Sequence, residues 1–135
     1  MPLIEWNENL SVNISEFDQQ HKKLIGMINE LHDAMRKRKA KDVLGKIVDG
    51  LIDYTETHFS NEEKYLEQFN YPRIVTQKKE HSYFVKKITE FKKGFDEGCP
   101  MLSIDIMNFL KDWLVNHIQG TDKKYSAFLN EKGMK

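Results

Sequence analysis

The sequence predicts an all-α fold, an antiparallel up-down-up-down four-helix bundle that follows an N-terminal arm. Apolar residues recur at alternating steps of three and four along four long stretches, which is the spacing of one buried helix face. The three prolines, which disfavour helix interiors, stand only at positions 2, 72 and 100. Four helices joined by short turns pack most simply as a bundle of antiparallel neighbours.

The chain has 135 residues, which is the usual size of one domain, so we expect a single domain over residues 1–135. Residues 1–14 precede the first helical stripe and form the expected arm. The apolar side chains of this arm should lie against the outside of the bundle, and they are Ile4, Trp6, Leu10 and Val12.

The first helix is expected over residues 15–38. Ser15 and Asp18 have the spacing of a capping box, in which side chains bond to the free backbone N–H groups at a helix start. A charged run at residues 36–41 suits the carboxyl end of the helix dipole and closes the helix. The inward stripe comprises Phe17, His21, Leu24, Ile28, Leu31 and Met35.

The second and third helices carry polar residues on stripes where apolar ones belong. The second helix is expected over residues 42–69, with the inward stripe Leu44, Val48, Leu51, Thr55, His58, Glu62 and Tyr65 or Leu66. A turn at residues 70–72 leads to the third helix, expected over residues 73–97, with the stripe Ile74, Gln77, His81, Phe84, Ile88, Phe91 and Phe95.

The fourth helix is expected over residues 103–130, with Ser103 as a candidate N-cap and Ile106, Leu110, Trp113 and His117 facing inward. Asp122 follows His117 by five residues, which leaves the two side chains about 140° apart on a regular helix. Both can face one site only if the helix is locally distorted. We therefore predict a π-type bulge between them, with Gly120 as the place where the backbone yields.

Composition excludes several classes of partner. Lys plus Arg and Asp plus Glu both total 21, so a long-range attraction to nucleic acid or to an anionic membrane is not expected. The first ten residues lack the pattern of a secretory signal, and no apolar stretch is long enough to span a membrane, so a soluble cytoplasmic protein is expected. Cys99 is the single cysteine, which excludes an intramolecular disulfide and a thiolate-only metal cage.

Histidines and carboxylates on the inward stripes predict a metal centre. Each inward stripe contributes one histidine, and Glu62 and Gln77 lie one turn from a histidine; the histidines are His21, His58, His81 and His117. A carboxylate on a core face needs a compensating cation, and the stripes carry no Lys or Arg. Imidazoles with carboxylates suit iron, zinc or manganese, and this number of ligands on opposed helices favours a dinuclear iron site. The His-Glu-x-x-His signature of zinc proteases is absent.

These residues, in this order, resemble the hemerythrin family, especially its bacterial single-domain form. The segments FDQQH at residues 17–21, HFSNEE at 58–63 and YP at 71–72 are also similar to family sequence, and the resemblance covers nearly the whole chain. It implies two non-haem irons beside a bridging oxo or hydroxo group. The implied metal ligands are His21 and His58 on one iron, residue 77, His81 and His117 on the other, and Glu62 and Asp122 as bridges.

The same resemblance implies reversible dioxygen binding at the open sixth position of the first iron, for oxygen carriage, storage or supply to an oxygen-using enzyme. It implies no enzymatic activity. Such binding needs a dry pocket, and the residues within a turn of the ligands are Leu24, Phe59, Trp113, Leu114 and Ile118. Each of them also fits ordinary core packing.

The chain departs from the family at Gln77, where the family has a histidine ligand. An amide oxygen can bind iron but is a weaker donor than imidazole. We predict that the Gln77 oxygen points at the second iron and either coordinates it or holds a water that does. The weaker donor keeps two alternatives open, namely a di-iron oxidase, peroxidase or nitric oxide reductase, and an oxygen or redox sensor. A sensor usually carries an output domain, so a solitary domain favours the carrier.

Overall fold

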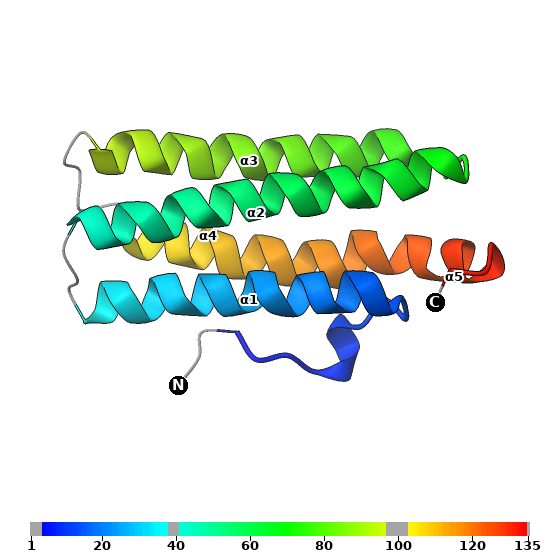
Figure 1. The fold of residues 1–135 in the computed structure, drawn as a ribbon, viewed down its shortest axis with the longest axis horizontal. Coiled ribbons are helices and arrows are strands. Elements are labelled where there is room, and N and C mark those ends of the chain that lie inside the picture. Colours follow the sequence, from blue (N-terminus) through cyan, green and yellow to red (C-terminus); the bar gives the residue numbers. More distant parts are fainter. Residues whose placement is uncertain (1–3, 38–40, 97–102, 135) are drawn as a thin grey trace.

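The computed structural model describes residues 4–37, 41–96 and 103–134. Long helices lie side by side with alternating directions, so the predicted antiparallel four-helix bundle is confirmed (Figure 1). The helices are α1 (Ser15–Arg36), α2 (Lys41–Gln68), α3 (Ile74–Asp96) and a fourth rod made of α4 (Ser103–Asn116), η3 (His117–Asp122) and α5 (Lys123–Glu131). A short 3-10 turn, η1 (Glu8–Leu10), lies in the arm. Cys99 and the side chains of Phe95 and Ser103 lie outside the described residues.

The start of α1 differs from the expected capping box. Ser15 is already the first helical residue, and no side chain caps the helix from the preceding Ile14. The Asp18 carboxylate instead accepts the Val12 backbone N–H at 2.8 Å and the Ser11 hydroxyl at 2.6 Å. Asn13, which follows Val12 in the chain, has a left-handed φ of 57°, which asparagine tolerates better than most residues. The capping-box prediction was therefore wrong, because Asp18 reaches past Ser15 to fix the arm.

The arm packs closely against the bundle. Ile4, Leu10 and Val12 are buried and Trp6 is partly buried, so the four apolar side chains pack against the bundle as expected, and three of them join its core. Asn29 on α1 bonds to both the N–H and the carbonyl of Ile4, at 2.9 and 2.8 Å. Figure 1 shows the arm running beside α1. The arm thus packs along α1.

The turn between α2 and α3 forms where the sequence places Asn70 and Pro72. Asn70 adopts a left-handed φ of 59°, and the Tyr71 N–H bonds to the carbonyl of Leu66 at 2.9 Å. This pattern satisfies the last carbonyls of α2 and ends the helix. Pro72 then follows as a residue that cannot continue the hydrogen-bond ladder. The described helix ends lie within one or two residues of those expected.

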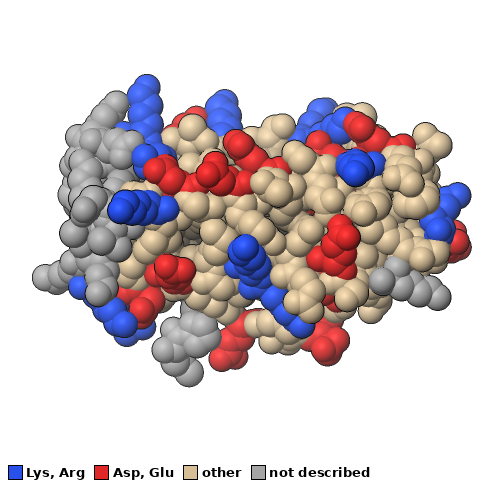
Figure 2. Space-filling view, viewed as in Figure 1, with Lys and Arg blue, Asp and Glu red and all other residues tan. Residues whose placement is uncertain are grey.

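The inward stripes form the core as predicted, with a few members only partly buried. Leu66, rather than Tyr65, is the fully buried residue at the end of the second stripe. The stripe residues that are partly buried are Met35, Leu44, Ile74 and Trp113. No described helix combines the length and apolar character needed to cross a membrane. Figure 2 shows Lys and Arg interspersed with Asp and Glu over one face.

The fourth rod contains the predicted distortion. Residues His117–Asp122 form a π-helical turn between two regular helices, which confirms the bulge inferred from the five-residue step. Gly120 lies within this turn, but a Cβ built there would meet nothing within 4 Å, so the space around this position does not require a glycine. The extra residue in the π-helical turn brings His117 and Asp122 to the same side of the helix.

Candidate metal centre

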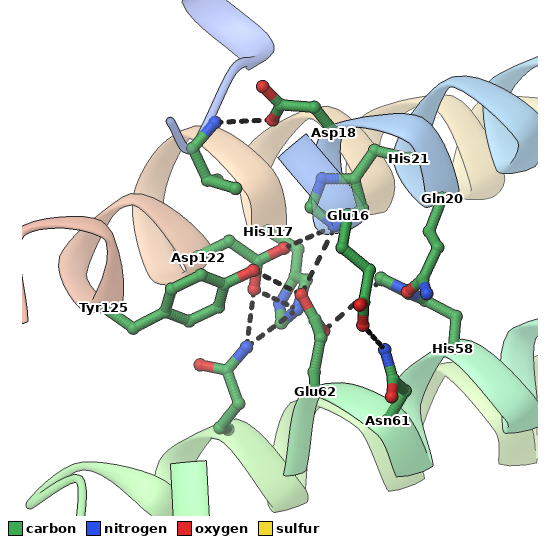
Figure 3. Close-up of polar contacts among 12 residues, drawn as sticks. Glu16, Asp18, Gln20, His21, His58, Asn61, Glu62, His117, Asp122 and Tyr125 are labelled. Carbon is green, nitrogen blue, oxygen red and sulfur yellow. Dashed lines mark hydrogen bonds and ion pairs between the residues drawn. The ribbon is translucent and has the colours of Figure 1, made fainter. Parts of the chain in front are cut away.

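All seven predicted ligand residues converge in the middle of the bundle. Each is at most 3 % exposed, and they come from α1, α2, α3 and η3. Figure 3 shows His21, His58 and His117 directed towards the carboxylates of Glu62 and Asp122. The structure thus brings together His21, His58, Glu62, Gln77, His81, His117 and Asp122.

Glu62 lies at the centre of two ligand groups. One group that could hold a metal ion comprises His21, His58 and Glu62, and the other comprises Glu62, His81, His117 and Asp122. The nearer oxygens of Glu62 lie 3.4 Å from the Nε2 atoms of His21 and His58 and 3.3 Å from that of His81. A carboxylate shared in this way is the expected bridge of a dinuclear site.

Asp122 also spans both groups. Its Oδ1 lies 3.0 Å from His117 Nε2, and its Oδ2 lies 3.3 Å from His21 Nε2. Several ligand atoms have no hydrogen-bond partner although they are buried, among them His21 Nε2, Glu62 Oε1 and Asp122 Oδ2. Buried polar atoms are normally paired, so these unpaired nitrogens and oxygens fit coordination to cations.

The electrostatics of the cluster also require positive charge. Burial alone would lower the pKa values of His21 and His117, but the nearby Asp122 and Glu62 carboxylates raise them to about 9 and about 10. Burial lowers the pKa of His58 to about 4 despite the nearby Glu62. Burial and Glu62 would raise the pKa of Asp122, but His117 and His21 hold it at about 2. Burial would also raise the pKa of Glu62, but His58 and His21 hold it well below its ordinary value, so both carboxylates stay charged and need compensating positive charge.

Three histidines are held from outside by residues that the sequence analysis did not assign. The Nδ1 of His58 donates to Gln20 Oε1 at 2.5 Å (Figure 3), and the Nδ1 of His81 donates to Glu63 Oε2 at 2.8 Å. The Nδ1 of His117 donates to Glu80 Oε1 at 2.7 Å. These bonds leave each Nε2 free of a proton in the neutral ring and aim it inward, as metal ligation requires.

Further residues support this outer layer. The Thr121 hydroxyl donates to both oxygens of Glu80, at 2.7 and 2.9 Å. The buried Tyr125 hydroxyl donates to Glu62 Oε2 (Figure 3). The sequence gives only a weak signal for these roles, because Gln20, Glu63 and Glu80 each neighbour one ligand along the chain but support a ligand on another helix.

Gln77 enters the cluster in an unexpected orientation. Its Nε2 donates to Asp122 Oδ1 at 2.5 Å and lies 3.4 Å from His81 Nε2 and 3.5 Å from His117 Nε2. Its Oε1 is buried without a hydrogen-bond partner. The prediction that the oxygen faces the centre is thus not met, because the charged Asp122 carboxylate accepts a hydrogen bond from the amide N–H instead. A half-turn of the amide exchanges the two atoms.

The five residues expected to line a dry pocket are buried or partly buried, and two of them stack on histidines. Leu24, Leu114 and Ile118 are buried. Phe59 is also buried, and its ring stacks on that of His81 with centroids 3.8 Å apart and an interplanar angle of 1°. Trp113 is partly buried, and its ring stacks on that of His117 with centroids 4.4 Å apart and an interplanar angle of 13°. Rings packed in this way keep water away from the faces of two ligands.

Comparisons with known proteins agree with this geometry. A family model described as "Hemerythrin HHE cation binding domain" matches residues 12–129. Bacteriohemerythrin of Stenotrophomonas maltophilia (strain R551-3) is 35 % identical, over 97 % of this chain and 87 % of that protein. Bacteriohemerythrin of Methylococcus capsulatus (strain Bath) is 34 % identical, over 96 % of this chain and 99 % of that protein. A crystal structure of wild-type hemerythrin superposes with a TM-score of 0.86 at 34 % identity, over 93 % of this chain and 96 % of that one.

Proposed function

The chain belongs to the hemerythrin family, and from this premise we propose that it binds dioxygen reversibly at two non-haem irons inside the bundle. The observation that carries the proposal is the pair of buried ligand groups that share Glu62. A single ion or a zinc site has no need of two carboxylates from separate helices between two sets of histidines. The function is oxygen carriage, storage or supply rather than catalysis.

The ligand residues divide between the two irons. His21 and His58 would hold the first, while His81, His117 and the residue at position 77 would hold the second. Glu62 and Asp122 would bridge them, together with an oxo or hydroxo group. When bound, the iron pair supplies two electrons and an open coordination position for dioxygen. In this proposal Gln77 turns its amide so that the oxygen faces the second iron, directly or through a water.

The surrounding residues make reversibility physically reasonable. The hydrogen bonds from His58, His81 and His117 to Gln20, Glu63 and Glu80 hold the imidazoles in the tautomer that binds metal. The apolar side chains of Leu24, Phe59, Leu114 and Ile118, together with Trp113, keep water from the centre. A dry surrounding is needed because stray protons or water would convert the bound oxygen irreversibly.

The proposal is tested by the visible absorption spectrum of the iron-loaded, reduced protein before air, after air and after argon. We expect a ligand-to-iron band that appears in air and disappears under argon over repeated cycles. Prompt oxidation that argon does not reverse would contradict the carrier function and favour a redox role. The parent protein loaded with zinc is the control, since zinc has no redox chemistry and should give no band.

A further inference from the structure

Thr55 on α2 carries a buried hydroxyl that has no partner. Its side chain is 0 % exposed, and Oγ1 makes no hydrogen bond in the described structure. Thr57, two residues further along and exposed, behaves as helix threonines often do, since its hydroxyl donates to the Asp53 carbonyl at 3.0 Å. Thr55 makes no such bond to any described residue. Its hydroxyl is therefore available for a partner that the described part of the chain does not provide.

The position of Thr55 relative to the metal centre follows from the helix directions. It lies three residues before His58, on the same face of α2 and about 4.5 Å along the helix axis. Glu62 lies one turn beyond His58 in the opposite direction. Because α1 and α3 run against α2 and the fourth rod (Figure 1), Leu24, Phe84 and Leu114 lie at the Thr55 end. Gln77, Asp122 and Tyr125 lie at the Glu62 end.

The two ends of the centre therefore differ in polarity. At the Glu62 end, two carboxylates and an amide face the histidines. At the Thr55 end, the neighbouring stripe residues Leu24, Phe84 and Leu114 are buried and apolar. A lone unsatisfied hydroxyl in such a layer lowers the stability of the fold, and valine would fill the same volume without that cost. Thr55 thus lies at the end of the centre where the described stripe residues Leu24, Phe84 and Leu114 are apolar.

We propose that the Thr55 hydroxyl is a specificity-determining group that hydrogen-bonds the outer atom of a small ligand held at the metal centre. This inference rests on the proposed function, because it places the ligand beside the His21 and His58 group. The ligands concerned are dioxygen and small linear anions with a hydrogen-bonding end. One ordinary hydrogen bond from Thr55 would slow ligand release without contributing to metal binding.

Thr55→Val is the direct test, with Thr55→Ser to restore the hydroxyl and Thr57→Val as the matched control. The probe is azide, titrated into the oxidised, iron-loaded proteins. We expect Thr55→Val to weaken azide binding about fivefold, the effect of one hydrogen bond, at unchanged iron content. Thr55→Ser should bind nearly as the parent does, and Thr57→Val should bind equally well. Equal affinity for the parent and Thr55→Val would overturn the proposal.

A second measurement needs no metal. Thermal unfolding of the metal-free proteins should show a midpoint for Thr55→Val at or above that of the parent, because the variant removes an unsatisfied buried hydroxyl at constant volume. A lower midpoint would mean that the hydroxyl has a structural partner, and would overturn the proposal. If the parent holds no iron pair, or binds neither azide nor dioxygen, both the proposed function and the role of Thr55 are wrong. If the parent binds both ligands and Thr55→Val binds azide equally well, only the role of Thr55 is wrong.

Discussion

The α1/α2 half of the centre and the α3/η3 half hold their histidines differently. His81 and His117 each donate to a carboxylate, whereas His58 donates to the neutral amide of Gln20. His21 Nδ1 is buried without a hydrogen-bond partner in the described structure. A carboxylate partner makes an imidazole a stronger metal ligand than an amide partner does.

This difference offers an explanation for how the chain tolerates Gln77. In the α3/η3 half, Gln77 stands in place of a third imidazole, and both histidines of this half donate hydrogen bonds to carboxylates. In the other half, two histidines with weaker support stand beside the apolar layer and Thr55. In the proposed di-iron centre, the stronger outer support would favour metal retention on the α3/η3 side, and the open coordination position would lie on the α1/α2 side.

Glu62→Gln should break the centre in both halves at once. Glu62 belongs to both ligand groups, and an amide there can neither balance the metal charge nor bridge two ions well. We expect the iron content to fall from about two per chain to below about one, measured by metal analysis after loading with ample iron.

Glu67→Gln is the matched control for this loss of iron. Glu67 lies on the exposed side of α2, where it pairs with Lys78, so this variant should load iron as the parent does. A Glu62→Gln protein that retained both irons would show that the two groups do not depend on a shared carboxylate.

Exchanging the outer partners should test the difference between the halves directly. Glu80→Gln removes the carboxylate behind His117, and we expect chelators to extract iron about tenfold faster. Gln20→Glu gives His58 a carboxylate partner instead, and should slow extraction from the α1/α2 half. If the two variants behave alike, outer charge does not set the difference between the halves.

Gln77→His should strengthen the α3/η3 half by restoring an imidazole. We expect iron loss to a chelator and autoxidation of the oxygenated form to slow by about threefold to tenfold. The two rates are measured for the parent and the variant under identical conditions. Unchanged rates would mean that Gln77 has no part in metal binding and acts only through its hydrogen bond to Asp122.

The metal-free protein should lose stability as the pH rises above neutrality. The pKa values of His21 and His117 are raised from 6.5 to about 9 and about 10 by the neighbouring carboxylates, against burial. Their stabilising protons are fully present below pH 6.5 and lost as the pH rises through 9 and 10. His58, with its pKa lowered to about 4, contributes no such loss in this range.

Urea unfolding at pH 7 and at about pH 10 checks this prediction, with a lower midpoint expected at the higher pH for the metal-free protein. The iron-loaded protein is the control, because metal ions replace those protons and its midpoint should change less. A metal-free midpoint that stays level or rises between these pH values would contradict the electrostatic account.

The helices and most of the centre could be predicted from the sequence because they depend on local spacing. The four stripes identify one histidine per helix, and the five-residue step from His117 to Asp122 requires the π turn that the structure contains. These inferences need only the geometry of one helix at a time. They therefore hold without knowledge of which helices touch.

The outer partners and the arm could not be predicted in this way. Gln20, Glu63 and Glu80 each support a histidine on a different helix, so their roles depend on the packing of the bundle. Asp18 similarly bonds to Val12 because the chain turns at Asn13, which the pattern of a capping box does not show. The orientation of Gln77 depends on its hydrogen bond to Asp122 on another helix, which spacing along the chain cannot reveal.

The ratio of bound dioxygen to iron tests the two-half account most directly. Reduced, iron-loaded protein is titrated with dioxygen in a sealed cell, and the gas released under argon is then measured. Because only the α1/α2 half would have an open position in the proposed centre, we expect about one dioxygen for every two irons, with nearly all of it recovered. Uptake of about one dioxygen per iron, or consumption without release, would contradict the account.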